Sequence, residues 1–95
     1  MTEVDFDVIV IGGGVAGCVS ALKIAEAGRS VVLIERGGTP GEKNLSGGIF
    51  YCRVMEQAIP GFVEQAPVER RISRNTISFL NAPSHVNIDY YDQRL

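Results

Sequence analysis

The pattern of apolar and polar residues along the chain changes near residue 48. Before that point, two short apolar runs, 8–11 and 31–34, stand on either side of a segment with helical periodicity. Continuous β-branched runs are typical of strands that are buried on both faces of a parallel sheet. The first half therefore predicts a strand over 6–11, a helix over 15–27 and a second strand over the later run. Together they have the length of one βαβ unit, with an expected right-handed crossover.

The predicted helix has an apolar face and ends at a glycine. Gly28 follows the last periodic position, where glycine commonly stops a helix. Because Cys18 belongs to the apolar face, we expect its side chain to pack as a small core residue. The whole face recurs at helical spacing and consists of Val15, Cys18, Val19, Ala21, Leu22 and Ala25.

The chain becomes irregular after the second predicted strand. Residues 37–48 show no periodicity and predict a loop. A short helix is expected over 49–58, because Pro60 and Gly61 follow it and stop it.

The last third of the chain changes to a strand pattern. Residues 76–80 and 86–90 alternate apolar with polar side chains, and turn-forming residues separate the two runs. They predict an antiparallel hairpin, with His85 on the surface at its turn. We therefore expect two regions, residues 1–48 and residues 49–95.

Composition and charge exclude several classes of protein. Nine lysines and arginines against eleven aspartates and glutamates give a net charge of −2, which argues against nucleic acid as the main ligand. No apolar run approaches the roughly 20 residues of a membrane-spanning helix. Acidic residues precede the first apolar run, whereas basic residues precede that of a signal peptide. A cytoplasmic location is therefore the default expectation.

The cysteines do not indicate a metal site. Cys18 and Cys52 lie far apart in the sequence, and His85, the single histidine, cannot complete a ligand set with them. In a cytoplasmic protein both thiols are expected to stay reduced. No side chain fits a catalytic pattern, and so we predict neither a metal ligand nor a catalytic residue.

Glycine is concentrated in the first half of the chain. Ten of the eleven glycines lie between Gly12 and Gly48. Three of them form the pattern Gly12-x-Gly14-x-x-Gly17 between the first predicted strand and the helix. In a dinucleotide-binding unit, the first glycine permits a sharp turn, the second lets a pyrophosphate approach the backbone, and the third brings the helix close to the sheet. N–H groups at the start of the helix would then bind the phosphates.

An acidic residue completes this pattern. Glu35 closes the second predicted strand, where a carboxylate can accept hydrogen bonds from ribose hydroxyls. An acid at this position would repel a 2′-phosphate, which argues against NADP. Arg36 beside it could cover an adenine, contact a phosphate, or simply be solvated. The alternative is an ordinary βαβ unit whose glycines only make turns. In that case the glycine spacing, its place between a predicted strand and a predicted helix, and the acid at the end of the second strand would coincide by accident.

The dinucleotide pattern alone does not separate FAD from NAD, because both present the same adenosine and pyrophosphate. A second cluster, Lys43-Asn44-x-Ser46-Gly47-Gly48, follows the acid after a short irregular segment. Adjacent glycines with Asn and Ser suit a close approach of the backbone to a flat or phosphorylated ligand. The same composition also fits an ordinary surface loop.

These residues resemble those of a known family, the FixC-type flavoproteins, which are similar to electron-transfer-flavoprotein:quinone oxidoreductases. The glycine pattern is shared by many FAD enzymes, whereas Lys-Asn-x-Ser-Gly-Gly is more specific. The similarity covers nearly the whole chain, in the stretches Asp7-Val-Ile-Val-Ile-Gly-Gly-Gly-Val-Ala-Gly-Cys, Leu33-Ile-Glu-Arg-Gly, Pro40-Gly-Glu-Lys-Asn-Leu-Ser-Gly-Gly, Ile59-Pro-Gly-Phe, Ala66-Pro-Val-Glu-Arg and Thr76-Ile-Ser-Phe-Leu.

The resemblance implies an α/β fold in two parts. Residues 1–48 would form the Rossmann-like βαβ unit and cofactor loop of a FAD-binding domain of the glutathione-reductase type. Residues 49–95 would begin a partly antiparallel, substrate-side region with a short helix and a hairpin. Members of the family are several times longer, so we expect a truncated product, a fragment or one piece of a split protein, with an incomplete domain.

The resemblance also implies non-covalently bound FAD, with the flavin itself accepting and passing on electrons. In the full-length form, an electron-transfer flavoprotein or similar donor would supply electrons to a quinone or another acceptor. The residues expected along the cofactor are Gly12, Gly13, Gly14, Val15, Ala16, Gly17, Glu35, Arg36, Lys43, Asn44, Ser46, Gly47 and Gly48.

Two alternatives to this function stay open. One is a non-catalytic nucleotide-binding fragment, and the other is a fragment of an NAD-dependent dehydrogenase. We do not expect the chain alone to be active. Two strands and one helix would leave one face of the sheet uncovered, which predicts either self-association or a compact fold of modest stability.

Overall fold

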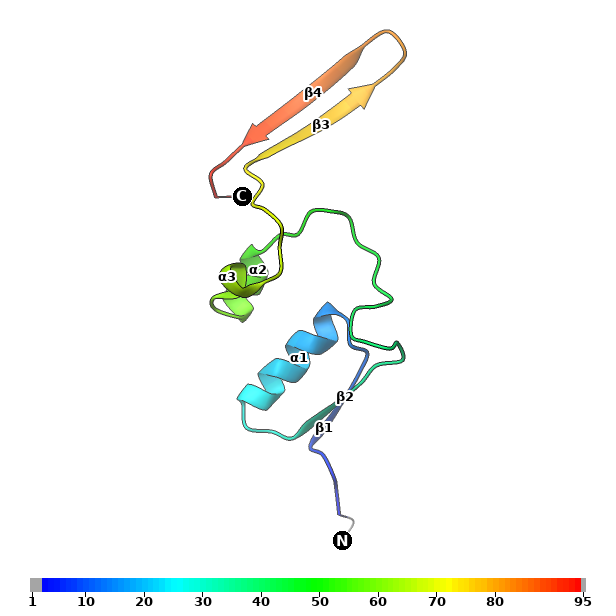
Figure 1. The fold of residues 1–95 in the computed structure, drawn as a ribbon, viewed down its shortest axis with the longest axis vertical. Helices are drawn as coiled ribbons and strands as arrows, with labels where there is room; N and C mark the ends of the chain where they lie inside the picture. The colour runs from blue at the N-terminus through cyan, green and yellow to red at the C-terminus, as the bar shows by residue number, and fades with distance from the viewer. Residues whose placement is uncertain (1–2, 95) are drawn as a thin grey trace. The chain divides into compact units, whose positions relative to one another are not determined.

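The computed structural model describes residues 3–94, which divide into two units after Gly48. Figure 1 shows the course of the chain through both units. The first unit contains β1 (Val8–Ile11), α1 (Val15–Glu26) and β2 (Val31–Ile34). The second unit contains α2 (Arg53–Ala58), α3 (Phe62–Gln65), β3 (Arg74–Leu80) and β4 (His85–Tyr91).

The first unit is the predicted βαβ arrangement. β1 and β2 pair in parallel, from Val8 opposite Val31 to Ile11 opposite Ile34, and α1 packs against both strands (Figure 1). The first strand begins at Val8 instead of residue 6. Before it, Asp7 and Ser30 exchange hydrogen bonds: Asp7 N–H donates to Ser30 Oγ at 2.8 Å, and Ser30 N–H donates to Asp7 Oδ2 at 2.9 Å.

The face of α1 that packs against the sheet agrees only in part with the predicted one. Val19 and Ala21 are partly buried, as predicted, but so are Gly17 and Ile24, whereas Cys18 is exposed. The prediction of Cys18 as a core residue is therefore wrong. Small side chains decide the orientation, because Gly17 and Ala21 let the helix approach the strands more closely than larger residues would.

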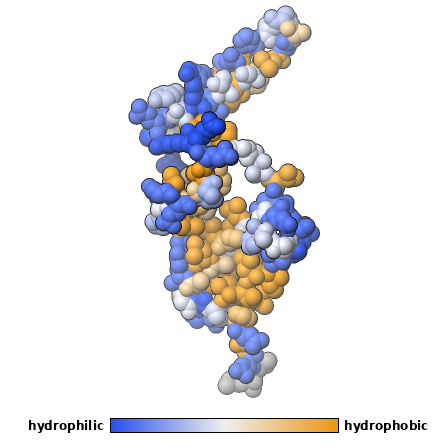
Figure 2. Space-filling view, viewed as in Figure 1, coloured by the Kyte–Doolittle hydropathy of each residue, from blue (hydrophilic) through white to orange (hydrophobic). Residues whose placement is uncertain are grey.

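Only one face of the β1–β2 sheet is covered. Ile9 and Ile11, which alternate with the residues facing α1, are 61% and 84% exposed. Their neighbour Ile34 on β2 is also exposed. Figure 2 shows hydrophobic residues gathered on the surface of this unit. The apolar runs alone suggested strands buried on both faces, but within residues 3–48 the second face is exposed, as expected for two strands covered by one helix.

In the second unit, two short helices surround a tight turn. The helix predicted over 49–58 begins only at Arg53, and α3 was not predicted. Gly61 has a φ of 83°, which lets the chain reverse between the helices. The Glu56 carboxylate accepts N–H groups from Gly61 at 2.8 Å and from Val63 at 2.9 Å. These bonds satisfy donors at the start of α3 that have no partner within the helix.

The predicted hairpin is present and slightly longer than expected. β3 and β4 pair antiparallel, from Arg74 opposite Tyr91 to Leu80 opposite His85. Arg74 Nε donates to Asp89 Oδ1 at 2.9 Å, which extends the pairing beyond residue 76. His85 is exposed, as predicted, although it already belongs to β4.

Two features are absent from residues 3–94, the part of the chain that the structure describes. None of their helices has the length and apolarity to cross a membrane. Within the same residues, no three or more histidine, cysteine, aspartate or glutamate side chains gather as metal ligands would.

Candidate functional site

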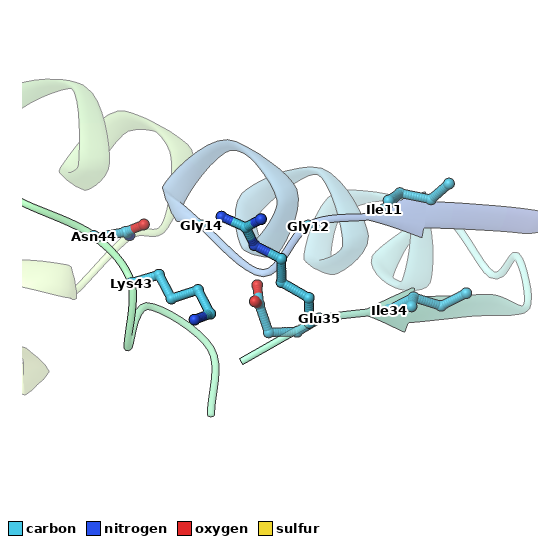
Figure 3. Close-up of a pocket in the computed structure, with 8 residues that line it drawn as sticks. Ile11, Gly12, Gly14, Ile34, Glu35, Lys43 and Asn44 are labelled. Atoms are coloured by element: carbon cyan, nitrogen blue, oxygen red, sulfur yellow. The ribbon is translucent and has the colours of Figure 1, made fainter. Parts of the chain in front are cut away.

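An open pocket of 390 Å³ lies where β1 and β2 end. Figure 3 shows the strand ends, the glycine turn and the loop after β2 meeting around it. Ligands of α/β proteins bind beyond the carboxyl ends of parallel strands, and so the fold favours this position. The residues that line the pocket are Ile11, Gly12, Gly14, Ile34, Glu35, Arg36, Lys43 and Asn44.

The glycine turn leads directly from β1 into α1. Gly12 has a φ of 102°, which is unfavourable for other residues, and its N–H donates to Ile34 O at 2.7 Å. Gly14 precedes the helix with an extended backbone, and its carbonyl accepts the N–H of Cys18 at 2.9 Å. The first turn of α1 contains no acidic residue, and no side chain caps it. Its free N–H groups and positive dipole end are therefore available to an anion.

Gly17 has the close packing expected of the third glycine. A Cβ at this position would lie 1.8 Å from Gly12 O and 3.6 Å from Cγ1 of Val10. Any side chain here would push α1 away from the turn and the sheet. The pattern of three glycines thus fixes how closely the helix start approaches the pocket.

Glu35 connects the two loops that form the pocket. Its Oε2 accepts the N–H of Gly13 at 2.6 Å, and its Oε1 accepts the N–H of Gly37 at 2.7 Å. The bond from Gly37, followed by that from Gly13, lowers the pKa of this carboxyl below its usual range. A carboxylate has about four acceptor positions, and so two bound N–H groups leave room for ribose hydroxyls.

Gly13 was predicted along the cofactor, but its contact with Glu35 was not predicted. The residue is buried, and a Cβ would lie 3.0 Å from Glu35 Oε2 and 3.2 Å from Pro40 Cβ. Gly13 stands at a variable position of the glycine pattern, so the pattern carries no signal for this contact. Gly37 was not predicted as a site residue either, because no pattern in the sequence marks its N–H as a partner of Glu35, two residues before it.

The structure brings together part of the predicted set. Lys43 and Asn44 reach the pocket from the loop, and Asn44 Oδ1 lies 3.7 Å from where a Cβ on Gly14 would be. Figure 3 shows both side chains on the loop beside the glycine turn. Gly13 and Gly17 do not line the pocket, but each contacts a residue that does: Gly13 donates to Glu35, and Gly17 lies against Gly12. The other predicted residues do not line it: Val15, Ala16, Ser46, Gly47 and Gly48.

Comparison with known proteins identifies the cofactor of the chain. Residues 7–91 match the family described as FAD dependent oxidoreductase. The chain belongs to this family. FAD is therefore its cofactor, as the resemblance predicted, and the choice between FAD and NAD that the glycine pattern left open is settled.

The relatives of the chain confirm the FixC-like resemblance. It is 48% identical over 94 residues to the probable electron transfer flavoprotein-quinone oxidoreductase YdiS of Escherichia coli K12, covering 99% of this chain and 22% of YdiS. Over 90 residues it is 46% identical to protein FixC of Escherichia coli O157:H7 and 43% identical to protein FixC of Bradyrhizobium diazoefficiens. Each alignment covers 95% of this chain and 21% of FixC. The chain thus spans about a fifth of the length of these relatives.

The residues at the pocket fit the diphosphate and ribose of FAD. The uncapped start of α1 offers N–H donors, and no side chain on Gly14 stands between them and a ligand. Arg36 and Lys43 place two cations around the same pocket as the Glu35 carboxylate. Cations and free amides suit phosphates, whereas a carboxylate suits hydroxyl groups.

Proposed function

We propose that residues 1–48 bind the ADP part of FAD as the nucleotide-binding segment of a FixC-like oxidoreductase. The supporting observation is that Gly14, directly before the uncapped start of α1, lines one pocket at the strand ends together with Glu35 and Lys43. In this proposal the unit belongs to a domain of the glutathione-reductase type, and residues 49–95 begin its substrate-side region.

Each group at the pocket has a distinct task in binding. The N–H groups after Gly14 donate to the diphosphate, and the cations Arg36 and Lys43 balance its charge. Glu35 accepts hydrogen bonds from the ribose hydroxyls while it keeps the glycine turn in place. FAD, when bound, supplies the redox chemistry. The chain itself orients the cofactor and excludes a 2′-phosphate.

The remaining predicted residues extend this binding mode along the cofactor. Val15 and Ala16 contribute through their backbone N–H groups, which explains why their side chains do not line the pocket. Ser46, Gly47 and Gly48 follow the cofactor towards the flavin. A Cβ on either of the two glycines would meet nothing within 4 Å, so the backbone there is open to a ligand.

The electron donor and acceptor are proposed from the relatives. YdiS is a probable electron transfer flavoprotein-quinone oxidoreductase. The identity to YdiS supports an electron-transfer flavoprotein as the donor of the whole protein and a quinone as its acceptor. A non-catalytic fragment that binds only the nucleotide is the second candidate, because the chain spans a fifth of its relatives.

Titration of the purified chain with FAD, followed by flavin fluorescence, tests the binding proposal. We expect saturable binding, and we expect Glu35→Ala to weaken it at least about tenfold, because both a charged acceptor and the support of Gly13 are lost. Ser20→Ala, on the exposed side of α1, is the matched control and should leave the affinity unchanged.

Three results would contradict parts of this proposal. Chain that takes up no FAD is not a flavoprotein segment by itself, which favours the nucleotide-binding fragment. Tight binding of NADH without FAD would favour a dehydrogenase fragment. An unchanged affinity of Glu35→Ala would remove Glu35 as the ribose ligand.

We also propose that the chain associates with copies of itself through its exposed apolar surface. No hydrophobic side chain among residues 3–94 is fully buried. The open face of the β1–β2 sheet and one face of the hairpin both expose large aliphatic side chains. Surfaces of this kind on soluble proteins mark sites of interaction.

A further inference from the structure

A second carboxylate, that of Glu42, holds the loop that carries Lys43 and Asn44. Glu42 Oε2 accepts the N–H of Gly38 in a short hydrogen bond. Backbone bonds add to this contact: Glu42 N–H donates to Thr39 O at 3.3 Å, and Asn44 N–H donates to Gly41 O at 3.0 Å. The side chain therefore closes the loop across its own turn, directly before the residues that reach the pocket.

The contact of Glu42 continues a chain of hydrogen bonds that begins at the glycine turn. Glu35 joins Gly13 to Gly37, and Glu42 takes the next amide, that of Gly38. The space around this pair of amides is already filled, because a Cβ on Gly37 would lie 2.9 Å from Glu42 Oε2 and 3.3 Å from Glu35 Oε1. The carboxylates of Glu35 and Glu42 thus each bind one of two consecutive backbone amides, those of Gly37 and Gly38.

The charge of Glu42 is unfavourable for the ligand that the pocket is proposed to bind. A carboxylate next to Lys43 reduces the positive potential that a diphosphate would meet. Its benefit must therefore be geometric. A loop that is ordered before binding does not lose conformational freedom when the ligand arrives, and this raises affinity.

We propose that Glu42 is a positioning residue, which fixes loop 37–44 through Gly38 so that Lys43 and Asn44 lie at the pocket before the cofactor binds. This inference rests on the proposed function for the role of the loop in FAD binding. The effect of Glu42 on the conformation of the loop is independent of FAD and is inferred only from the hydrogen bonds of Glu42 within the loop.

Two substitutions separate the geometric role from the charge. Glu42→Ala and Glu42→Gln remove the same negative charge, but the glutamine keeps an oxygen that can accept the Gly38 N–H. We expect Glu42→Ala to weaken FAD binding by about tenfold and Glu42→Gln to stay within about threefold of the unchanged chain. If the charge alone mattered, both variants would bind FAD more tightly and to the same extent, which would overturn the proposal.

Hydrogen exchange without FAD tests the hold on the loop independently. Glu42→Ala should speed exchange of the Gly38 amide by about tenfold, while Glu42→Gln and the Gly13 amide in all variants should change little. Equal exchange of Gly38 in the unchanged chain and in Glu42→Ala would refute the positioning role. A chain that binds no FAD but shows this exchange pattern would overturn the proposed function and leave the hold of Glu42 confirmed.

Discussion

Both units of the chain use a glutamate to bind backbone amides, but over very different ranges of sequence. In the first unit, Glu35 joins the loop after β2 to Gly13 in the turn after β1, a residue 22 positions away. In the second unit, Glu56 bonds Gly61 and Val63, which lie five and seven positions further along the chain. One carboxylate ties together distant segments, and the other closes a local turn.

This difference helps to explain why the pocket that we propose to bind the cofactor forms in the first unit. A binding pocket needs groups from separate segments to converge, and the parallel pairing of β1 and β2 brings their carboxyl ends to one edge. The hairpin of the second unit connects only neighbouring segments. One of its faces is apolar and exposed, and consists of Ile77, Phe79, Val86, Ile88 and Tyr90.

The largest effect is expected where the first unit packs most closely. Gly17→Ala would place a Cβ 1.8 Å from Gly12 O, so α1 must move away from the glycine turn. We expect a loss of about 3 kcal/mol in the stability of the first unit and no measurable FAD binding. Circular dichroism during chemical unfolding and FAD titration measure the two effects.

The comparison between the units sharpens this test. Amide exchange in the β3–β4 hairpin should be the same in Gly17→Ala and in the unchanged chain, because the hairpin belongs to the second unit. Ser20→Ala on the exposed side of the same helix should behave like the unchanged chain. Native stability of Gly17→Ala would show that the close approach of α1 is not required.

Much of the fold could be predicted because it depends on local patterns. The apolar runs located β1 and β2, the three glycines located the turn, and Gly28, with a φ of 79°, ends α1 as expected. The face of α1 was predicted correctly only in part, since periodicity reports apolar positions whereas the packing also depends on small ones such as Gly17. The short helix α3 was missed because side-chain bonds from Glu56 help to define its start.

The site was predictable only where a residue type signals its task. Gly12, Gly14 and Glu35 line the pocket, as do Lys43 and Asn44 from the second glycine-rich cluster. The amides of Gly13, Gly37 and Gly38 gave no such signal. Gly13 meets Glu35 only once the glycine turn and the loop after β2 are folded against one another. Gly37 and Gly38 bind carboxylates two and four positions away along the chain, but no sequence pattern marks these contacts.

A moderate effect is expected on the apolar face of the hairpin. Ile88 is 55% exposed in the middle of that face, and a lysine there would place a charge in any contact between copies. We expect Ile88→Lys to weaken self-association by about tenfold in sedimentation experiments over a range of concentrations. Asn87→Lys, on the opposite face of the same strand, is the matched control for the added charge. If Ile88→Lys and Asn87→Lys associate equally strongly, the contact between copies does not involve the apolar face of the hairpin. If the unchanged chain is a monomer, the proposal of self-association is wrong.

The smallest effect, and the most direct comparison of the two units, is the response of both glutamates to acid. Hydrogen bonds from Gly37 and Gly13 lower the pKa of Glu35, and bonds from Val63 and Gly61 lower that of Glu56. Because each folded pKa lies below the ordinary value of 4.5, these contacts contribute fully above that value and are lost as the pH falls through the lowered pKa.

We therefore expect amide protection, corrected for intrinsic exchange rates, to be constant near neutral pH and to fall as the pH drops through the lowered pKa of each glutamate. In Glu35→Gln the amides of Gly13 and Gly37 should lose this acid response, although the two residues belong to different loops. In Glu56→Gln only Gly61 and Val63 should lose it. A response of Gly13 to acid that survives in Glu35→Gln would mean that the carboxylate does not join the two loops, and the contrast between a long-range and a local contact would no longer explain why the pocket forms where it does.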